Sequence, residues 1–266
     1  MSDLDRIDPA AGAFTPRPGS APFVQQVLAQ ASMEARLMVR NGEQLLLAVV
    51  IPVLVLVGGV EAAQHIDLGL SERPIDELVP GVLALAVMST AFTSLAIATG
   101  FERRYGVLKR LGASPLPRSG LLAGKVLALL LVEVLQLAVL SVVGALLGWS
   151  PVLTGTSVVG AVLAVLLGTA AFASLGLLMA GALRAEATLA AANLVYLLLL
   201  AGGAVVLPAS AYGAFGDVAA WLPSGALGEA MREAFLDGTV AWRDLAVLLG
   251  WSVVGTFATA RTFSWE

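Results

Sequence analysis

Cysteine is absent from the 266-residue chain, so disulfides, thiolate nucleophiles and cysteine-ligated metals are all excluded. Histidine is almost absent. His65 stands alone, whereas a metal site requires two or three such ligands at coordinating spacing. No serine lies in a Gly-x-Ser-x-Gly elbow. These absences predict that the chain is not an enzyme and holds no cofactor of its own.

A phosphate-binding loop is also missing. The run SGLLAGKV around Lys125 has Ser119 where that motif requires its first glycine, and Val126 where it requires Ser or Thr. The motif needs both, because backbone amides surround the phosphates and the hydroxyl holds magnesium. We therefore expect ATP and magnesium to bind elsewhere than on this chain.

Charged residues are scarce. They make up 13% of the chain, against 58% hydrophobic residues, whereas an ordinary soluble domain carries about 25% charged residues. So few charged residues cannot cover a water-facing surface, so lipid must be the solvent for most of the chain. The composition predicts an all-α, polytopic membrane protein.

Six apolar runs have the length of membrane spans, since a hydrocarbon core about 30 Å thick requires about 20 apolar residues in a helix. The predicted spans are Leu45–Val60, Val79–Thr99, Leu121–Leu147, Val152–Leu183, Thr188–Leu207 and Leu245–Ala260. They divide the chain into a disordered tail (1–22), an interfacial helix (23–44), a transmembrane domain (45–260) and a C-terminal tail (261–266).

The distribution of Lys and Arg orients the spans. With the N-terminus inside, all of them except Arg73, Arg232 and Arg243 fall on the cytoplasmic side, as the positive-inside rule requires. Both termini are then cytoplasmic. The heavy use of Ala, Val, Leu and Gly is typical of a GC-rich bacterial genome, so we expect a multi-pass protein of the bacterial inner membrane.

The segment Phe23–Arg40 has the periodicity of an amphipathic helix on the membrane surface. Gln25, Gln26, Gln30 and Arg40 lie away from its apolar face. That face is formed by Val24, Val27, Leu28, Ala31, Ala35 and Met38.

The loop FERRYGVLKRLGASPLP (101–117) separates the second and third spans. Four apolar residues, Phe101, Tyr105, Leu108 and Leu111, form a stripe among charged ones, and Gly112 ends the helical pattern. Composition alone favours a basic loop attracted to anionic lipid. The stripe itself indicates that something packs on the loop.

A shorter helix is predicted between the last two spans. Ser224 is a candidate N-cap and the pattern ends near Gly238. The apolar face of this helix is formed by Leu227, Ala230, Met231, Ala234 and Phe235.

Three polar residues fall within the spans. Glu133 and Gln136 lie on nearly one face of the third span, and Asn193 lies in the fifth. Each has two interpretations: a group in the substrate path, or a hydrogen-bonded contact between helices or subunits. The second is favoured, because interhelical contact is a common use of such residues.

In this order, the segments resemble the membrane subunits of type 2 ABC exporters, the group that includes drug-, lipid- and polysaccharide-export permeases. The resemblance is carried by Phe23–Arg40, FERRYGVLKRLGASPLP, GLLAGKVLALLLVEVLQ, GLLMAGALRAEATLAAANLVYLLLLAGG and WLPSGALGEAMREAFLDG.

The resemblance implies that the loop after the second span is a coupling helix that docks on a separate ABC ATPase subunit. The positions that match it are Glu102, Arg103, Arg104, Tyr105, Gly106, Leu108 and Lys109. It also implies contact between the N-terminal helix and the ATPase, a re-entrant outer element at Leu227–Phe235, and pairing with a second copy or a paralogous permease. The expected partners are therefore proteins and membrane lipid, not nucleic acid.

Three alternatives remain open from the sequence. A heme-exporter-like permease would have similar spans. A secondary carrier should show inverted repeats and midplane ion-binding groups, and only Glu133 is of that kind. A non-transporting scaffold or immunity subunit would also need spans and a docking loop.

Overall fold

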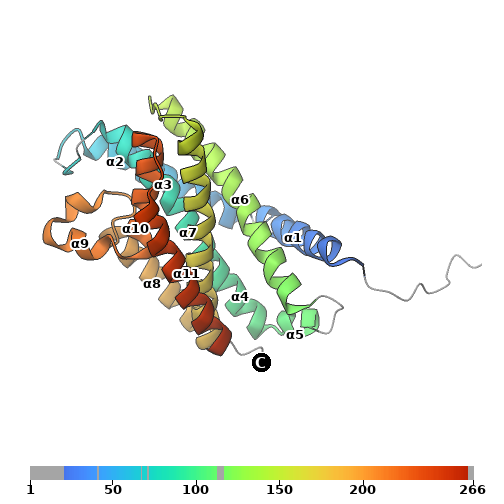
Figure 1. Ribbon diagram of the computed structural model, residues 1–266. Helices are drawn as coiled ribbons and strands as arrows, with labels where there is room; N and C mark the ends of the chain where they lie inside the picture. The colour runs from blue at the N-terminus through green and yellow to red at the C-terminus, as the bar shows by residue number, and fades with distance from the viewer. Residues whose placement is uncertain (1–20, 41, 67, 71, 113–116, 263–266) are drawn as a thin grey trace, which may run out of the picture.

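The computed structural model describes residues 21–40, 42–66, 68–70, 72–112 and 117–262 (Figure 1). The predicted tail at residues 1–22 lies almost wholly outside this part, as does most of the predicted C-terminal tail. The described residues form helices and no strand. The prediction of an all-α fold is therefore confirmed.

Five helical segments within the described ranges are long and apolar enough to cross a membrane. They are α3 to α4 (Pro74–Met88, the π-helix η2 at Ser89–Ser94, and Leu95–Arg104), α6 (Arg118–Leu146), α7 (Gly155–Ala182), α8 (Ala185–Gly202) and α11 (Trp242–Thr262). The first predicted span corresponds to α2 (Gly42–Ala62), whose shorter apolar part is Ala48–Ala62. The polytopic fold is confirmed, and the number of six spans stays a prediction.

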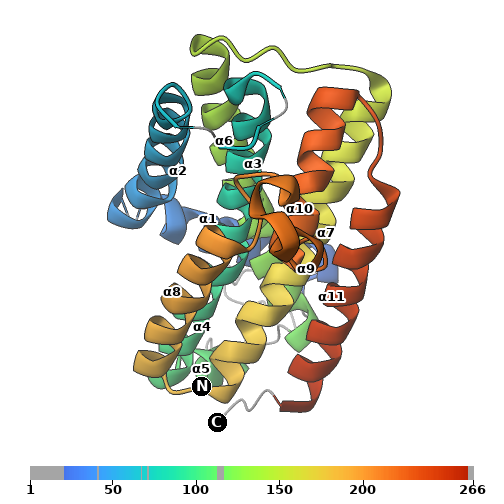
Figure 2. The same ribbon diagram turned by 90° about the vertical axis from the view of Figure 1, so that its left-hand side faces the viewer.

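The continuous segment α3–η2–α4 is the centre of the bundle. Every residue from Ile75 to Met88 is buried, because α2, α6, α7 and α10 (Pro223–Arg232) pack around α3. In Figure 2, α2 and α8 lie on one side of this centre and α11 on the other. An apolar helix that is hydrophobic all round is expected in such a position.

Small residues bring α7 and α11 together. A Cβ atom added to Gly255 would clash with the Oγ atom of Ser174, so the two backbones approach closely. One turn further on, the Thr259 hydroxyl donates a 2.8 Å hydrogen bond to the carbonyl oxygen of Ser174. In lipid, the hydrophobic effect does not drive helices together. Close van der Waals packing of small residues stabilises the contact between α7 and α11 instead.

The first helix, α1 (Phe23–Arg40), packs along α6. Its buried residues are Gln30, Ala31 and Glu34, whereas Val24 and Leu28 are exposed. The buried face therefore combines Ala31, from the predicted apolar face, with the polar residues Gln30 and Glu34 beside it, while other residues of the predicted face stay exposed. Periodicity finds the apolar side of the helix, but polar pairing with α6 decides which side is buried.

Two helices have a boundary that differs from the predicted span, one at its start and one at its end. The fourth predicted span begins at α7, after a capping box in which Thr154 and Ser157 bond each other's backbone. The fifth, α8, ends at Gly202 rather than at Leu207. The residues that follow, 203–206, are buried but not helical.

The segment between the last two spans returns into the bundle. It comprises η3 (Ala209–Phe215), α9 (Gly216–Ala219), α10 and η4 (Glu233–Asp237), and α10 packs on α3, α7 and α11. The predicted end at Gly238 is confirmed by its left-handed conformation. The predicted cap is wrong, because the Ser224 hydroxyl donates instead to the carbonyl oxygen of Gly203, at 2.8 Å.

Arg232 holds the non-helical segment after α8. This arginine is 3% exposed, and its guanidinium donates to the carbonyl oxygens of Ala204, Val205 and Val206 over 3.2 to 3.3 Å. Ala204 has a φ of 53°, a left-handed conformation that costs a residue with a side chain about 1–2 kcal/mol. Arg232 satisfies the carbonyl groups that this bend leaves without helical partners.

We expect Arg232→Met to lower the melting temperature of the detergent-purified protein by several degrees, because it leaves three buried carbonyl groups without donors. Glu229 forms the ion pair with Arg232 but is itself partly exposed, so Glu229→Gln should change the melting temperature far less. The melting temperature is measured by size-exclusion chromatography after heating. Equal melting temperatures for Arg232→Met and the unaltered protein would contradict the role assigned to Arg232.

Candidate functional site

The predicted coupling loop is a turn between two helices. α4 ends at Arg104 and α5 covers Val107–Gly112, so the expected helical stripe is interrupted at Gly106. Gly106 has a φ of 69°, which glycine adopts without the penalty that a side chain imposes. Residues 113–116 and the side chain of Leu108 lie outside the described part of the chain.

A buried lysine joins three helices beneath this turn. The ammonium of Lys125, on α6, contacts the carboxylate of Glu34, on α1, at 2.8 Å and the carboxylate of Glu102, on α4, at 2.7 Å. Lys125 is 5% exposed. Breaking such a buried arrangement by removing one partner typically costs about 3–5 kcal/mol, because the charges left behind are unpaired.

α1 lies close enough to α6 for this contact because Gly124 has no side chain. A Cβ atom at Gly124 would come within 2.6 Å of the Gln30 side chain. The Gln30 amide in turn donates a 2.8 Å hydrogen bond to the Glu34 carboxylate that Lys125 binds. The polar face of α1 is thus fixed by α6.

Arg103 and Arg104 face two different neighbours. Arg103 donates to the carbonyl oxygens of Gly181 and Leu183, at the C-terminal end of α7, where a cation is favoured by the helix dipole. Arg104 forms an ion pair with Glu186, at the start of α8. These two residues attach the end of α4 to the turn between α7 and α8.

A basic concavity of about 560 Å³ lies beside the turn. It is lined by Gly100, Arg103, Arg104, Gly106, Lys109, Arg184, Ala185 and Glu186. Tyr105 stacks on Phe101 at the edge of this region and is 65% exposed. We call this concavity, together with α5, the coupling surface, after the coupling helix that the sequence predicts at this position. With four basic side chains against one acidic one, it is suited to an acidic protein surface.

The predicted residues divide into two groups. Glu102 and Arg103 bind other parts of the protomer, whereas Tyr105 and Lys109 are exposed. The sequence missed Glu34 and Arg184, and it noted Lys125 only within the rejected phosphate-loop run. A lysine just inside a predicted span was itself a signal, because an ionisable group at that depth requires a partner.

The polar residues of the spans bind other helices. Glu133 and Gln136 are both fully buried. Glu133 accepts a 2.7 Å hydrogen bond from Thr169 on α7. Gln136 accepts one from Thr90 in η2, at 2.6 Å, and donates one to the carbonyl oxygen of Ala48 in α2, at 2.9 Å. This geometry favours interhelical contact for both. Asn193, in contrast, lies on the exposed side of α8.

Comparison with known proteins supplies the family. The model of the ABC-2 family transporter protein matches residues 64–261, which is most of the chain and contains α4, the coupling surface and the segment around α10. No curated protein and no solved structure matched the chain. The match covers well over half of the chain, and the chain therefore belongs to the ABC-2 family of transporter proteins.

Proposed function

We propose that the chain is the membrane-spanning permease subunit of an ABC exporter, with both termini in the cytoplasm of a bacterial cell. A separate ATPase subunit binds ATP and magnesium, and this chain conducts the substrate outward across the inner membrane. The observation that carries the proposal is the coupling surface, an exposed basic element attached through buried ion pairs to the spans of an ABC-2 family chain.

The coupling surface is where the ATPase docks. Lys109 and Arg110 on α5 are exposed and belong to none of the ion pairs found among the described residues. Their charges are therefore available to a partner. Tyr105 adds an exposed aromatic ring, a residue type enriched in protein interfaces.

Motion of the ATPase reaches the spans through Glu102 and Lys125. Glu102 lies near the end of α4, so a force on the coupling surface acts on it directly, and Lys125 passes that force to α6 and α1. Further along the same segment lies η2, and a π-helix inside a span is a common place for a hinge. We infer that the two halves of α3–η2–α4 move relative to each other at η2.

A second copy of the chain covers the exposed side of α8. Asn193 lies there between Leu189 and Leu197, one turn away on either side along the same stripe. An amide is costly against hydrocarbon, so contact with a partner subunit accounts for its position better than contact with lipid. Two permease subunits then enclose the path.

Apolar side chains dominate the spans, so the path suits a hydrophobic or amphipathic substrate. Leu, Val and Ala make up most of α6, α7 and α8. Export of an amphipathic dye by the reconstituted complex tests this point directly. A non-transporting scaffold would retain the ATPase but move no dye.

Reversing one charge on the coupling surface should weaken ATPase capture. We expect Lys109→Glu to reduce co-purification of the ATPase roughly fivefold, the scale of a reversed exposed ion pair. The matched control is Arg261→Glu, which makes the same charge change at the end of α11, away from the coupling surface. If both variants retain the ATPase equally, the docking site is elsewhere.

Neutralising the buried ion pairs should separate ATPase binding from transport. Lys125→Met alone is expected to lower the free energy of unfolding, because it leaves Glu34 and Glu102 unpaired. The triple variant with Glu34→Gln and Glu102→Gln removes all three charges and should regain stability, bind the ATPase and yet transport dye slowly. A triple variant that transports at the unaltered rate would show that these ion pairs only stabilise the fold.

The absence of natural cysteine allows a clean test of the subunit contact. Asn193→Cys should form a disulfide-linked dimer under mild oxidation, read by non-reducing electrophoresis of membranes, because a disulfide requires Cα atoms within about 7 Å. Leu249→Cys, on the exposed side of α11, is the control and should stay monomeric. Efficient linkage through Leu249→Cys alone would place the contact on α11 instead.

A further inference from the structure

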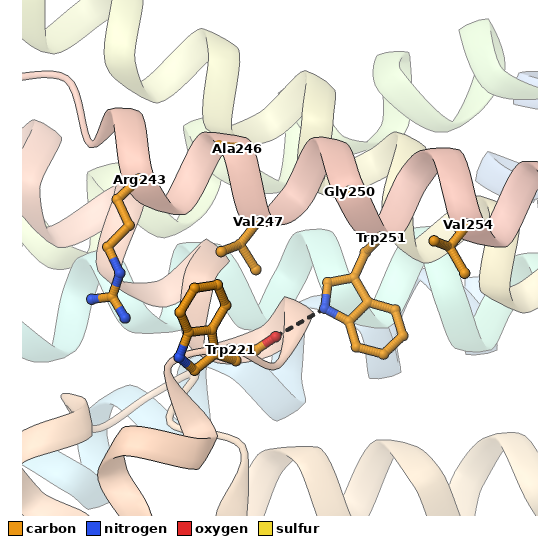
Figure 3. Close-up of a pocket in the computed structure, with 7 residues that line it drawn as sticks. All are labelled: Trp221, Arg243, Ala246, Val247, Gly250, Trp251 and Val254. Carbon is orange, nitrogen blue, oxygen red and sulfur yellow. Dashed lines mark hydrogen bonds between the residues drawn. The ribbon is translucent and has the colours of Figure 1, made fainter.

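A groove of about 520 Å³ runs along α11, between this helix and the turn that follows α9 (Figure 3). Its lining residues are Trp221, Arg243, Ala246, Val247, Gly250, Trp251 and Val254. It lies outside the coupling surface, and the proposed transport mechanism does not use it.

The rim of the groove is fixed by two contacts. The indole N–H of Trp251 donates a 2.9 Å hydrogen bond to the carbonyl oxygen of Trp221. The guanidinium of Arg243 lies 5.2 Å from the centre of the Trp221 ring, which is 61% exposed. These contacts hold a cation and an exposed aromatic ring side by side at one end of α11.

The rest of the groove is apolar and follows the helix. Val247, Gly250 and Val254 are spaced so that they lie on the same face of α11 as Arg243. Gly250 leaves this face hollow, since a Cβ atom added there would meet nothing within 4 Å. The groove thus has a cationic head and an apolar trough directed along the span.

The charge of Arg243 is available to a ligand. Arg243 belongs to none of the ion pairs found among the described residues. The neighbouring acid, Asp244, interacts with it electrostatically but is itself buried, at 6% exposed. An anion approaching from the membrane meets Arg243 first.

We propose that this groove binds an anionic phospholipid, with its phosphate at Arg243 and one acyl chain along Val247, Gly250 and Val254. The charge and the apolar trough match the two parts of such a molecule in the order in which they occur at a membrane surface. The proposal depends on the position of α11 in the membrane and not on transport, so it can fail or succeed independently of the exporter function.

Tryptophan residues alone would not make the groove selective for anionic lipid. Tryptophan residues at a membrane surface bind the headgroup region whatever its charge. A cation in the groove adds selectivity for anionic headgroups, about 1 kcal/mol for one Arg near the surface, which corresponds to about fivefold enrichment. Headgroup selectivity is therefore the property to measure.

Bromine-labelled lipids report which lipid lies next to the groove. The probe protein keeps Trp221 and Trp251 and carries Trp149→Phe, Trp242→Phe and Trp265→Phe. It is reconstituted twice in vesicles of the same phosphatidylglycerol and phosphatidylcholine content, with dibromo chains on one lipid and then on the other. The ratio of the two quenching efficiencies gives the local enrichment of the anionic lipid.

We expect about fivefold enrichment of phosphatidylglycerol, reduced to none by Arg243→Gln and not by Arg261→Gln at the other end of α11. Gly250→Leu fills the trough and should also abolish the enrichment. Its control is Gly58→Leu in α2, where an added side chain likewise meets no neighbour.

Equal quenching by both lipids in the unaltered groove would overturn the proposal, and so would enrichment that survives Arg243→Gln. Loss of enrichment in Arg261→Gln as well as in Arg243→Gln would indicate general attraction to the membrane charge and would equally overturn it.

Discussion

The ammonium of Lys125, held between the carboxylates of Glu34 and Glu102, joins α1, α4 and α6 at the end of the molecule where α4 turns into α5. A buried cation must be paired, so the three helices that carry these side chains cannot separate without a large electrostatic cost. The group of three carries one net negative charge, and the Gln30 amide offsets part of it by donating to Glu34. The second oxygen of Glu102 is buried without a hydrogen-bond partner. This imbalance makes the strength of the contact strongly dependent on its geometry.

A second set of polar contacts lies deeper in the bundle, around the π-helix η2. Gln136 on α6 accepts from Thr90 within η2 and donates to the backbone of α2, so one side chain of α6 binds both the middle of the central segment and α2. α4 beyond η2 carries Glu102, and α3 before η2 contacts α10. The contacts of Lys125 and of Gln136 therefore lie on the same helix, at two levels. Rotation or tilt of α6 therefore alters both contacts.

Hydropathy and periodicity could predict the class of fold, the approximate positions of the helices, and a short helical loop between the second and third spans, but not the turn at Gly106 that divides this loop. They could not predict which face of α1 is buried, because the contact is made by Gln30 and Glu34 and depends on Lys125, far away in sequence. The end of α8 was missed for a related reason. Residues 203–207 are as apolar as a span, and the carbonyl groups of residues 203–206 can leave the helix because the distant Ser224 and Arg232 donate hydrogen bonds to them. In both places a charged side chain from another element overrides the local pattern.

The hydrogen-bond partners of an arginine indicate whether its charge stabilises the fold of a membrane protein or is available for binding. Backbone carbonyl groups that leave a helix within the bundle have no water to bind, and a guanidinium, with its five N–H donors, can serve several of them at once. Arg103 does this at the end of α7, and Arg232 does it after α8. Arg110 and Arg243 have no such carbonyl partner among the described residues, and both are exposed. Counting basic residues by side of the membrane treats all four alike. Their hydrogen bonds distinguish two that hold the chain together from two exposed ones, for which we propose a protein partner and a lipid.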